Sequence, residues 1–564
     1  MSTVTITISS GGTVMDPSYQ VLSVDVVKEV NRIPYAQIVL LDGDAAEQKF
    51  AISDETFFEP GKEIEIKLRY ENDTIGDVSV FKGLVVRHAV EANEKGMLLT
   101  VEMKDAAIKM TQSRRSEVYK KDLTDDKIIG DLITKAGLTK GKLATMQAPN
   151  PELVQYYSTD WDFMLSRADV YGMAVVAEDG TISISEMKLS GQPKHTFEFG
   201  ITPIYNFEIE VDGNHQYADV QSIAWDVKNQ KLTAATKAKA FTLSQGNVKA
   251  ATVADAVGGK LQLLSDPVSL DPKELQAWAD GAMIKSRMAM IRGRISTPGT
   301  GDIHPMEVME VAGVGKRFNG KTLITGVRHQ VDVSGWQTDV QFGLSAERFA
   351  SQRDIIDPPA AGQLPGVNGL QIGVVDKFEE DPDKEFRVKV ILPGIDETKG
   401  AVWARLASPQ AGKERGYFFR PETGDEVVVG FFNDDPRQAV ILGAMFGSKN
   451  TPPKDLSTLT KDNIDKGIVT KTGSIIHFID DKKAAILIAT PKLNKVLLDD
   501  DNEMVEITDQ HGNAITMNKD GIQIKSVKDL KIDGSKGNVE IKAKALTINA
   551  SGKVEIKGSA VDVK

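Results

Sequence analysis

Six short apolar pairs recur at the C-terminal end of the sequence, and they constrain the fold more than any other feature. In each pair, two apolar residues are separated by one residue, and the first members are 8, 9, 7, 8 and 7 residues apart. The pairs are Ile522/Ile524, Leu530/Ile532, Val539/Ile541, Leu546/Ile548, Val554/Ile556 and Val561/Val563. Short strands that recur at a near-constant period are typical of a solenoid or β-helix.

These six strands are too narrow to close a core within one chain. Three chains winding together would form a triangular prism with all twelve residues of the pairs inside it and no open strand edges. The sequence therefore predicts a trimeric β-helix needle about 30 Å long, at about 4.8 Å per strand, with its end close to the domain that precedes it. The alternative is that the pairs form one face of a larger sheet within the same chain.

The chain before this repeat is mainly β, with a few helices. Ile64, Ile66 and Leu68 alternate with charged residues, as expected of a half-buried strand. Helical spacing of apolar residues predicts helices over 125–137, 159–171 and 272–291. We expect residues 1–355 to form two β-rich subdomains with helices.

Residues 356–369, which include Pro358, Pro359 and Pro365, read as a linker. Residues 370–450 follow as a set of short alternating strands, such as Val388/Val390/Leu392 and Val427/Val429/Phe431. A small antiparallel barrel of the OB type is the natural interpretation. The needle is then expected over residues 470–564.

Composition excludes several classes of protein. The net charge of −12 argues against a general nucleic-acid binder. The sequence has no cysteine, so disulfides, thiolate metal sites and a cysteine nucleophile are excluded, and assembly in a reducing cytoplasm is consistent with this. The N-terminus does not resemble a signal peptide, and no apolar run is long enough to span a membrane.

Three patterns that could carry chemistry have simpler explanations. Residues 315–322, GKRFNGKT, match a phosphate-binding loop, but strand-like alternation follows where a helix is needed, which favours a hairpin turn. Glu422, Asp425 and Glu426 could serve glycoside hydrolysis, but they read better as charged turn residues. The seven histidines have no metal-binding spacing, so we expect no zinc site; they are His88, His195, His215, His304, His329, His477 and His511.

Lysine is frequent in the repeat. Residues 521–564 contain nine Lys and five acidic residues, a net charge of 9 − 5 = +4. These lysines could contact anionic lipid, but we expect them chiefly to solvate the outer faces of the strands.

Residues 387–394 (RVKVILPG) and 403–446 (WARLASPQAGKERGYFFRPETGDEVVVGFFNDDPRQAVILGAMF) closely resemble the barrel domain of VgrG proteins and phage baseplate spikes. Residues 470–482 and 507–522 resemble the entry into the needle of that family, and segments at 31–44, 57–70, 81–88, 156–173 and 335–345 resemble its hub. The matching barrel residues are Trp403, Arg405, Gly412, Gly416, Pro421, Gly424, Glu426, Pro436 and Gly443.

The resemblance implies a non-enzymatic homotrimer, the hub and puncturing needle of a contractile injection system, with no catalytic residue, metal or cofactor. It implies that the hub meets an Hcp-like tail tube and baseplate proteins, and that effectors travel with the spike. A PAAR-type tip protein is expected to dock on Ala560, Val561, Val563 and Lys564. The protein would assemble in the bacterial cytoplasm, leave the cell without a signal peptide, and contact the target membrane transiently.

Two departures from the family pattern are informative. Residues 446–470 leave no room for the lysozyme domain of some phage relatives, and no effector domain is expected after Lys564. The alternatives are a tail-associated peptidoglycan hydrolase and a trimeric tail-fibre adhesin. A type VI secretion system, an extracellular injection system and a phage-like particle all remain open.

Overall fold

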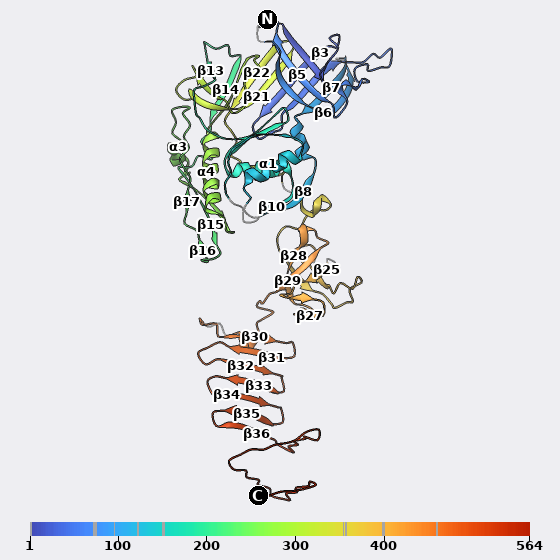
Figure 1. The fold of residues 1–564 in the computed structure, drawn as a ribbon, viewed down its shortest axis with the longest axis vertical. Coiled ribbons are helices and arrows are strands. Elements are labelled where there is room, and N and C mark those ends of the chain that lie inside the picture. The colour runs from blue at the N-terminus through green and yellow to red at the C-terminus, as the bar shows by residue number, and fades with distance from the viewer. Residues whose placement is uncertain are drawn as a thin grey trace. The chain divides into compact units, whose positions relative to one another are not determined.

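The structure is a computed structural model that describes residues 3–71, 76–94, 96–120, 123–148, 153–353, 355, 358–396, 401–457 and 461–563. The chain divides into two compact units, residues 1–358 and 359–564. Strands dominate both units, and few helices are present (Figure 1). The expectation of a mainly β protein with a few helices is therefore confirmed.

A 13-stranded sheet forms the frame of the first unit, the hub. Its main path runs β14-β19-β22-β21-β3-β4-β7-β6-β5-β1-β2, and β20 joins β13 to β21. The strands are β1 (Val4–Ser10), β2 (Thr13–Val14), β3 (Val21–Glu29), β4 (Tyr35–Leu41), β5 (Glu63–Tyr70), β6 (Val78–Asn93), β7 (Gly96–Lys104), β13 (His195–Glu198), β14 (Asn206–Val211), β19 (Ile291–Pro298), β20 (Val308–Ala312), β21 (Gly320–Asp332) and β22 (Gly335–Phe342).

Apolar residues alternate with polar ones along these strands, and the apolar residues form the core of the sheet. On β5, Ile64, Ile66 and Leu68 are fully buried, whereas the charged residues between them are more exposed. The contact between β21 and β3 joins strands nearly 300 residues apart in sequence, with Arg328 holding Asp25 through two hydrogen bonds of 2.8 and 2.6 Å. The main sheet of the hub is thus assembled from both ends of residues 1–358.

The helices lie beside this sheet (Figure 1). They are α1 (Asp125–Lys135), α2 (Asp160–Val170), α3 (Ala250–Val257) and α4 (Pro272–Met288). Three match the predicted helices, and α3 was not predicted. Cap chemistry explains the boundaries: Asp271 accepts a hydrogen bond from the Lys273 amide at 2.8 Å, and Gly137 and Gly172 follow α1 and α2 with positive φ angles.

Three smaller sheets complete the hub. Their strands are β8 (Arg114–Tyr119) and β10 (Leu153–Thr159); β9 (Thr139–Leu143), β11 (Met173–Glu178) and β12 (Thr181–Glu186); and β15 (Asp219–Asp226), β16 (Lys231–Leu232), β17 (Thr236–Lys237) and β18 (Leu261–Asp266).

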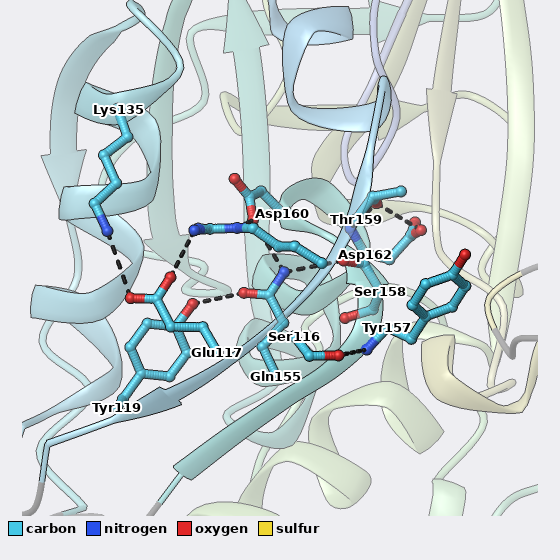
Figure 2. A network of polar contacts seen from close by, with 11 residues as sticks. Ser116, Glu117, Tyr119, Lys135, Gln155, Tyr157, Ser158, Thr159, Asp160 and Asp162 are labelled. Atoms are coloured by element: carbon cyan, nitrogen blue, oxygen red, sulfur yellow. Dashed lines mark hydrogen bonds and ion pairs between the residues drawn. The ribbon is translucent and has the colours of Figure 1, made fainter.

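Figure 2 shows the polar network that fixes β8 and β10 against the start of α2. Gln155 accepts a hydrogen bond from the Tyr119 hydroxyl at 2.5 Å and donates to Asp160 at 2.9 Å. Thr159 caps α2 by accepting from the Asp162 amide at 3.0 Å. Because Gln155 is buried, these bonds satisfy its amide and tie the strand pair to the helix.

The second unit begins with a closed five-stranded barrel, in the order β23-β24-β25-β29-β28. Its strands are β23 (Gln371–Val375), β24 (Val388–Ile391), β25 (Ala401–Leu406), β28 (Glu426–Phe431) and β29 (Ala439–Ala444), and a small hairpin of β26 (Ala411–Gly412) and β27 (Arg415–Gly416) extends from it. Val388, Val390, Val427 and Val429 lie in its core, as their alternation predicted.

An antiparallel seven-stranded sheet follows, in which each strand pairs with the next one along the chain. Its strands are β30 (Asp465–Val469), β31 (Ile475–Ile479), β32 (Ala485–Ala489), β33 (Lys495–Asp499), β34 (Met504–Thr508), β35 (Ala514–Asn518) and β36 (Gly521–Lys525). Between Ser526 and Val563 the chain forms no strand (Figure 1).

Candidate trimerisation interface

One face of the β30–β36 sheet is almost entirely apolar. Cross-strand pairs place the apolar residues in two columns that cross the sheet from strand to strand. One column is Ile468, Ile476, Ile488, Val496, Ile507, Ile515 and Ile524, and the other is Phe478, Ile486, Leu498, Val505, Met517 and Ile522. A water-exposed apolar face of this extent marks an interaction surface.

The opposite face of the sheet is much more polar. Lys495 and Glu506 form an ion pair across β33 and β34 at 2.6 Å, and His477 contacts Asp465 at 2.9 Å. On the apolar face, Lys466 pairs with Asp480 at 2.7 Å beside the first strand, but the two apolar columns contain no charged residue, and Leu498 there remains 41% exposed. The asymmetry identifies which side of the sheet needs a partner.

The apolar pairs predicted for the needle core continue this face. Ile522 and Ile524 lie on β36, at the end of the two columns. The other five pairs lie between Ser526 and Val563, where the chain forms no strand. The alternative of a larger sheet in the same chain therefore holds for Ile522/Ile524 on β36, whereas within the described residues no strand pairs with the other five pairs.

A single chain leaves all of these pairs exposed, so it does not test their predicted place in the core of a trimer. Their side chains are 54–88% exposed. The twelve exposed residues are Ile522, Ile524, Leu530, Ile532, Val539, Ile541, Leu546, Ile548, Val554, Ile556, Val561 and Val563. The physical reason is that one chain supplies a single layer of short segments, and a single layer cannot bury its apolar side chains until another layer packs against it. Their burial about a threefold axis therefore stays a prediction about the assembly.

Sequence reasoning missed the residues of the apolar face between β30 and β35. Their signal was present: pairs such as Ile486/Ile488 and Val496/Leu498 have the same form, but they recur at 9 or 10 residues rather than about 8. The needle-like segment therefore contains seven strands ahead of most of the predicted pairs. The expectation that its end lies close to the barrel is wrong, because the sheet intervenes along the chain.

The predicted tip-docking residues stand at the far end of this segment. Val561 is 59% exposed and Val563 88% exposed, and Ala560 is exposed as well. Lys564 lies outside the described residues. Neither Val561 nor Val563 is covered by the described part of the chain.

The predicted barrel residues do not converge on one site. Trp403 lies on β25, with the Arg387 and Lys389 cations 5.8 and 5.9 Å from its ring centroid. Arg387 also binds Asp381, and this ion pair holds the pKa of the Asp381 carboxyl well below its usual range. Arg405 on the same strand and Glu426 on β28 are exposed.

The remaining barrel residues shape turns and strand ends. Gly416 has a φ of +134°, and a Cβ there would lie 2.2 Å from the Gln410 carbonyl oxygen. Gly424 has a φ of +88° in the turn before β28. Gly412 lies on β26, Pro421 lies just before the turn that leads into β28, Pro436 lies in the turn between β28 and β29, and Gly443 lies on β29 at a register shift against β28. These residues form the barrel rather than a reaction centre.

The acidic cluster and the loop-like sequence at 315–322, which could have carried chemistry, have structural roles. Glu422 pairs with Lys471 at 2.9 Å, and Asp425 accepts a hydrogen bond from the Glu422 amide, so the acidic cluster is a turn. Residues 315–319 lie in the connection between β20 and β21, and residues 320–322 begin β21, which pairs antiparallel with β20; this confirms the hairpin. Within the described ranges, no group of three or more His, Asp or Glu side chains could hold a metal ion.

Three family models together match most of the chain. Residues 1–332 match the Alg8 N-terminal domain, residues 371–446 the type VI secretion system/phage-baseplate injector OB domain, and residues 485–563 the phage baseplate V C-terminal trimerisation domain. A β-rich hub, an injector barrel and a trimerisation domain define the class of baseplate spike proteins. The chain belongs to the VgrG and phage-baseplate hub-and-spike family, with its first 332 residues in the Alg8 N-terminal domain family.

Curated relatives carry the same assignment in their names. Type VI secretion system spike proteins VgrG1c and VgrG1a of Pseudomonas aeruginosa are each 29% identical over 184 residues, which is 30% of this chain. The chain matches only about a quarter of their length, 25% and 28% respectively. The Vibrio cholerae actin cross-linking toxin VgrG1 is 34% identical over 99 residues, 16% of this chain and 9% of that protein.

Solved structures resemble the chain at low identity. A tail protein from Neisseria meningitidis MC58 has a TM-score of 0.44 at 14% identity, covering 62% of this chain and 98% of its own. An E. coli component of the type VI secretion system has a TM-score of 0.38 at 13% identity, covering 78% of this chain and 99% of its own.

No helix among the described residues is long and apolar enough to cross a bilayer.

Proposed function

We propose that three copies of this chain form the non-enzymatic spike of a contractile injection system. The observation that carries the proposal is the two-column apolar face of β30–β36, which continues into five pairs that have no strand partner among the described residues. Three such faces turned toward a common axis would remove the apolar columns from water and supply strand partners for residues 526–563. The match to a trimerisation domain over 485–563 supports the same number of chains.

The mechanical role follows from this architecture. In a closed prism, backbone hydrogen bonds between chains would be satisfied along the whole shaft. Bending the shaft would break many of these bonds together, so the trimer would resist deformation. Such a shaft could transmit thrust from a contracting sheath to a target envelope. This role requires stiffness and docking surfaces rather than reaction chemistry.

The mass in solution tests the trimer. Light scattering on the purified full-length chain should give three times 61.4 kDa, or a multiple of that trimer. A stable monomer at micromolar concentration, with residues 526–563 protected from proteolysis, would refute the proposal. A monomer with an unprotected tail would refute it equally, since the needle would then not form.

The partners extend the proposal. The hub would meet an Hcp-like tail tube and baseplate proteins, and effectors would leave with the spike after assembly in the cytoplasm. A conical PAAR-type protein would cover Val561 and Val563 of all three chains, because exposed apolar ends and strand edges attract a partner. The spike would reach the cell exterior and the target membrane only on firing.

A deletion tests the tip. Removing residues 559–564 should abolish capture of the tip protein and secretion while leaving the trimer intact. A chain with Lys557→Ser, which changes a polar residue just before this segment, is the control and should keep both. If the deleted chain still captures its tip protein and still supports firing, the docking site is elsewhere.

The absence of catalysis is also a proposal. The spike should release no soluble fragments from purified peptidoglycan under conditions in which a lysozyme control does. Hydrolysis by the full-length chain that survives replacement of Glu422, Asp425 and Glu426 by the corresponding amides would reveal an enzyme with a site elsewhere.

A further inference from the structure

A cavity of about 150 Å³ lies in the hub, between α2, α4 and the segment after β22. Val170, Trp278, Ala282, Ala346 and Ala350 supply its apolar wall. A cavity of this volume accommodates a molecule the size of one aromatic ring, since an engineered protein cavity of 150 Å³ binds benzene. All residues of the wall belong to the first unit, so the cavity is complete within one hub.

Arg348 is the unusual group in this wall. Its guanidinium carbon lies 5.1 Å from the centroid of the Trp278 ring, and the side chain is half-buried. Within the described residues, no carboxylate lies within ion-pair distance of the guanidinium. Burial lowers the pKa of Arg348, which reflects the missing solvation of the charged form.

The carboxylate in the same wall, Asp169, is already engaged. One of its oxygens pairs with Lys285, and the other accepts a hydrogen bond from the Phe349 amide at 3.1 Å. Lys285 donates to the Glu347 carbonyl oxygen as well. Asp169 therefore serves to hold the 347–349 segment against α4, and it lies beyond ion-pair distance of Arg348, although its charge partly offsets the effect of burial on the pKa of that guanidinium.

Further polar groups line the cavity, among them Ser166, His215 and Ser286. Tyr217 brings a hydroxyl, and Gln262 brings an amide with two N–H donors. Neither side chain makes a hydrogen bond within the described part of the chain. The wall thus combines one cation beyond ion-pair distance of any described carboxylate, several available donors and a flat apolar surface.

We propose that this cavity binds a carboxylate whose organic part is about the size of one aromatic ring, with Arg348 as its ion-pair partner. A guanidinium presents two parallel N–H groups that match the two oxygens of a carboxylate. Stacking on Trp278 fixes the plane of the guanidinium and leaves its edge available. The carboxylate can come from a free small acid or from the C-terminus of a peptide.

Benzoate and its neutral isostere benzamide test the proposal on the full-length protein. Saturation-transfer NMR and calorimetric titration should show benzoate bound at least about tenfold more tightly than benzamide. Arg348→Gln should weaken benzoate binding by at least about tenfold, and Arg348→Lys, which keeps the charge, should weaken it less. Arg317→Gln removes an exposed arginine on the β20–β21 loop and should change nothing.

Three results would overturn the proposal. They are equal binding of benzoate and benzamide, unchanged benzoate binding in Arg348→Gln, and no binding of any carboxylate at about 10 mM, far above a millimolar dissociation constant. Hydrogen exchange of α2 and α4 shows whether the Arg348→Gln hub is folded, and Arg348→Lys provides the comparison if it is not.

A pair of peptides separates the two sources of the carboxylate. Acetyl-Leu-Ala with a free C-terminus is compared with its C-terminal amide. Preference for the free acid at a tighter dissociation constant than benzoate supports a chain terminus as the natural ligand. Tighter binding of benzoate supports a free small acid, and both results support the carboxylate site.

Discussion

Arg167 on α2 holds the fully buried carboxylate of Asp125 at the start of α1 through two hydrogen bonds, of 2.8 Å to Oδ1 and 3.0 Å to Oδ2. The same guanidinium reaches Glu274 on α4 at 2.8 Å, so one cation joins three helices. Arg167→Met leaves the Asp125 charge buried without its partner. It should cost the hub about 3–5 kcal/mol, measured by hydrogen exchange in α1 and α2.

The matched control is Arg87→Met, which removes an exposed ion pair with Glu102. This change should cost no more than about 1 kcal/mol. Equal costs at the two positions would show that the buried pair does not hold the helices together.

Neighbouring residues on β33 test the orientation of the needle sheet. Leu498→Lys places a charge on the apolar face, whereas Leu497→Lys places it on the opposite face, across from Glu506. Leu498→Lys should dissociate the trimer, because three unpaired charges would be buried at several kcal/mol each. Leu497→Lys should leave the trimer intact. Light scattering distinguishes the two, and the reverse pattern would mean that the apolar columns face outward.

The repeats beyond β36 allow a second test of the same interface. Val554→Asp together with Ile556→Asp should fray the end of the needle or dissociate the chains, while the hub stays folded, because both apolar side chains are expected to face the axis. Lys553→Asp with Lys557→Asp changes the flanking exposed residues and serves as the control. Protection of residues 526–563 from protease reports the result.

Two glycines of the barrel should respond differently to substitution by alanine. A Cβ at Gly373 would lie 2.4 Å from a Val390 side-chain carbon and 2.9 Å from one of Val429, whereas a Cβ at Gly443 would meet nothing within 4 Å. Gly373→Ala should therefore destabilise the barrel by about 1–3 kcal/mol through overpacking. Gly443→Ala should leave its thermal unfolding nearly unchanged, and a large loss there would contradict the proposed cause.

Protonation should control the loop between β19 and β20. His304 contacts Glu178 at 3.2 Å, and Lys28 donates to the same carboxylate at 2.9 Å. The hydrogen bond with Glu178 raises the pKa of His304, and the hydrogen bond with His304 is the main cause that lowers the pKa of Glu178 to about 2.

The raised pKa of His304 and the lowered pKa of Glu178 together define the pH range in which this contact stabilises the loop most. The contribution of His304 to folding stability is complete below its unfolded pKa near 6.5, and it is lost as the pH rises through the higher pKa of the folded state. The contribution of Glu178 is complete above about pH 4.5, and it is lost as the pH falls toward 2. Amide protection of residues 302–307 should therefore peak between about pH 5 and 6.5. His304→Gln should remove the decrease at higher pH, whereas His511→Gln, in the exposed turn between β34 and β35, should not.

Helices α1, α2 and α4 could be predicted from the sequence because their signals are local, whereas α3 has no side-chain cap and was missed. Thr159 and Asp271 cap α2 and α4, and Gly137 and Gly172 end α1 and α2, so composition within one turn fixes each boundary. The β30–β35 face was missed because its pairs recur at a different period from the later ones. The pairing of β21 with β3 depends on contacts far apart in sequence, as does the cavity that joins Ser166 to Ala350, and no local pattern encodes them.

The meander of β30–β36 also bears on how three identical tails could be aligned. A shaft of nearly equivalent octads permits a slip by one whole repeat, because every Val-x-Val pair would still meet another. The meander has unlike neighbours at each level, such as Phe478 opposite Ile486 and Val505 opposite Met517, and its turns are short enough to form within one chain. Chains that meet first along these strands would enter the repeats already in phase.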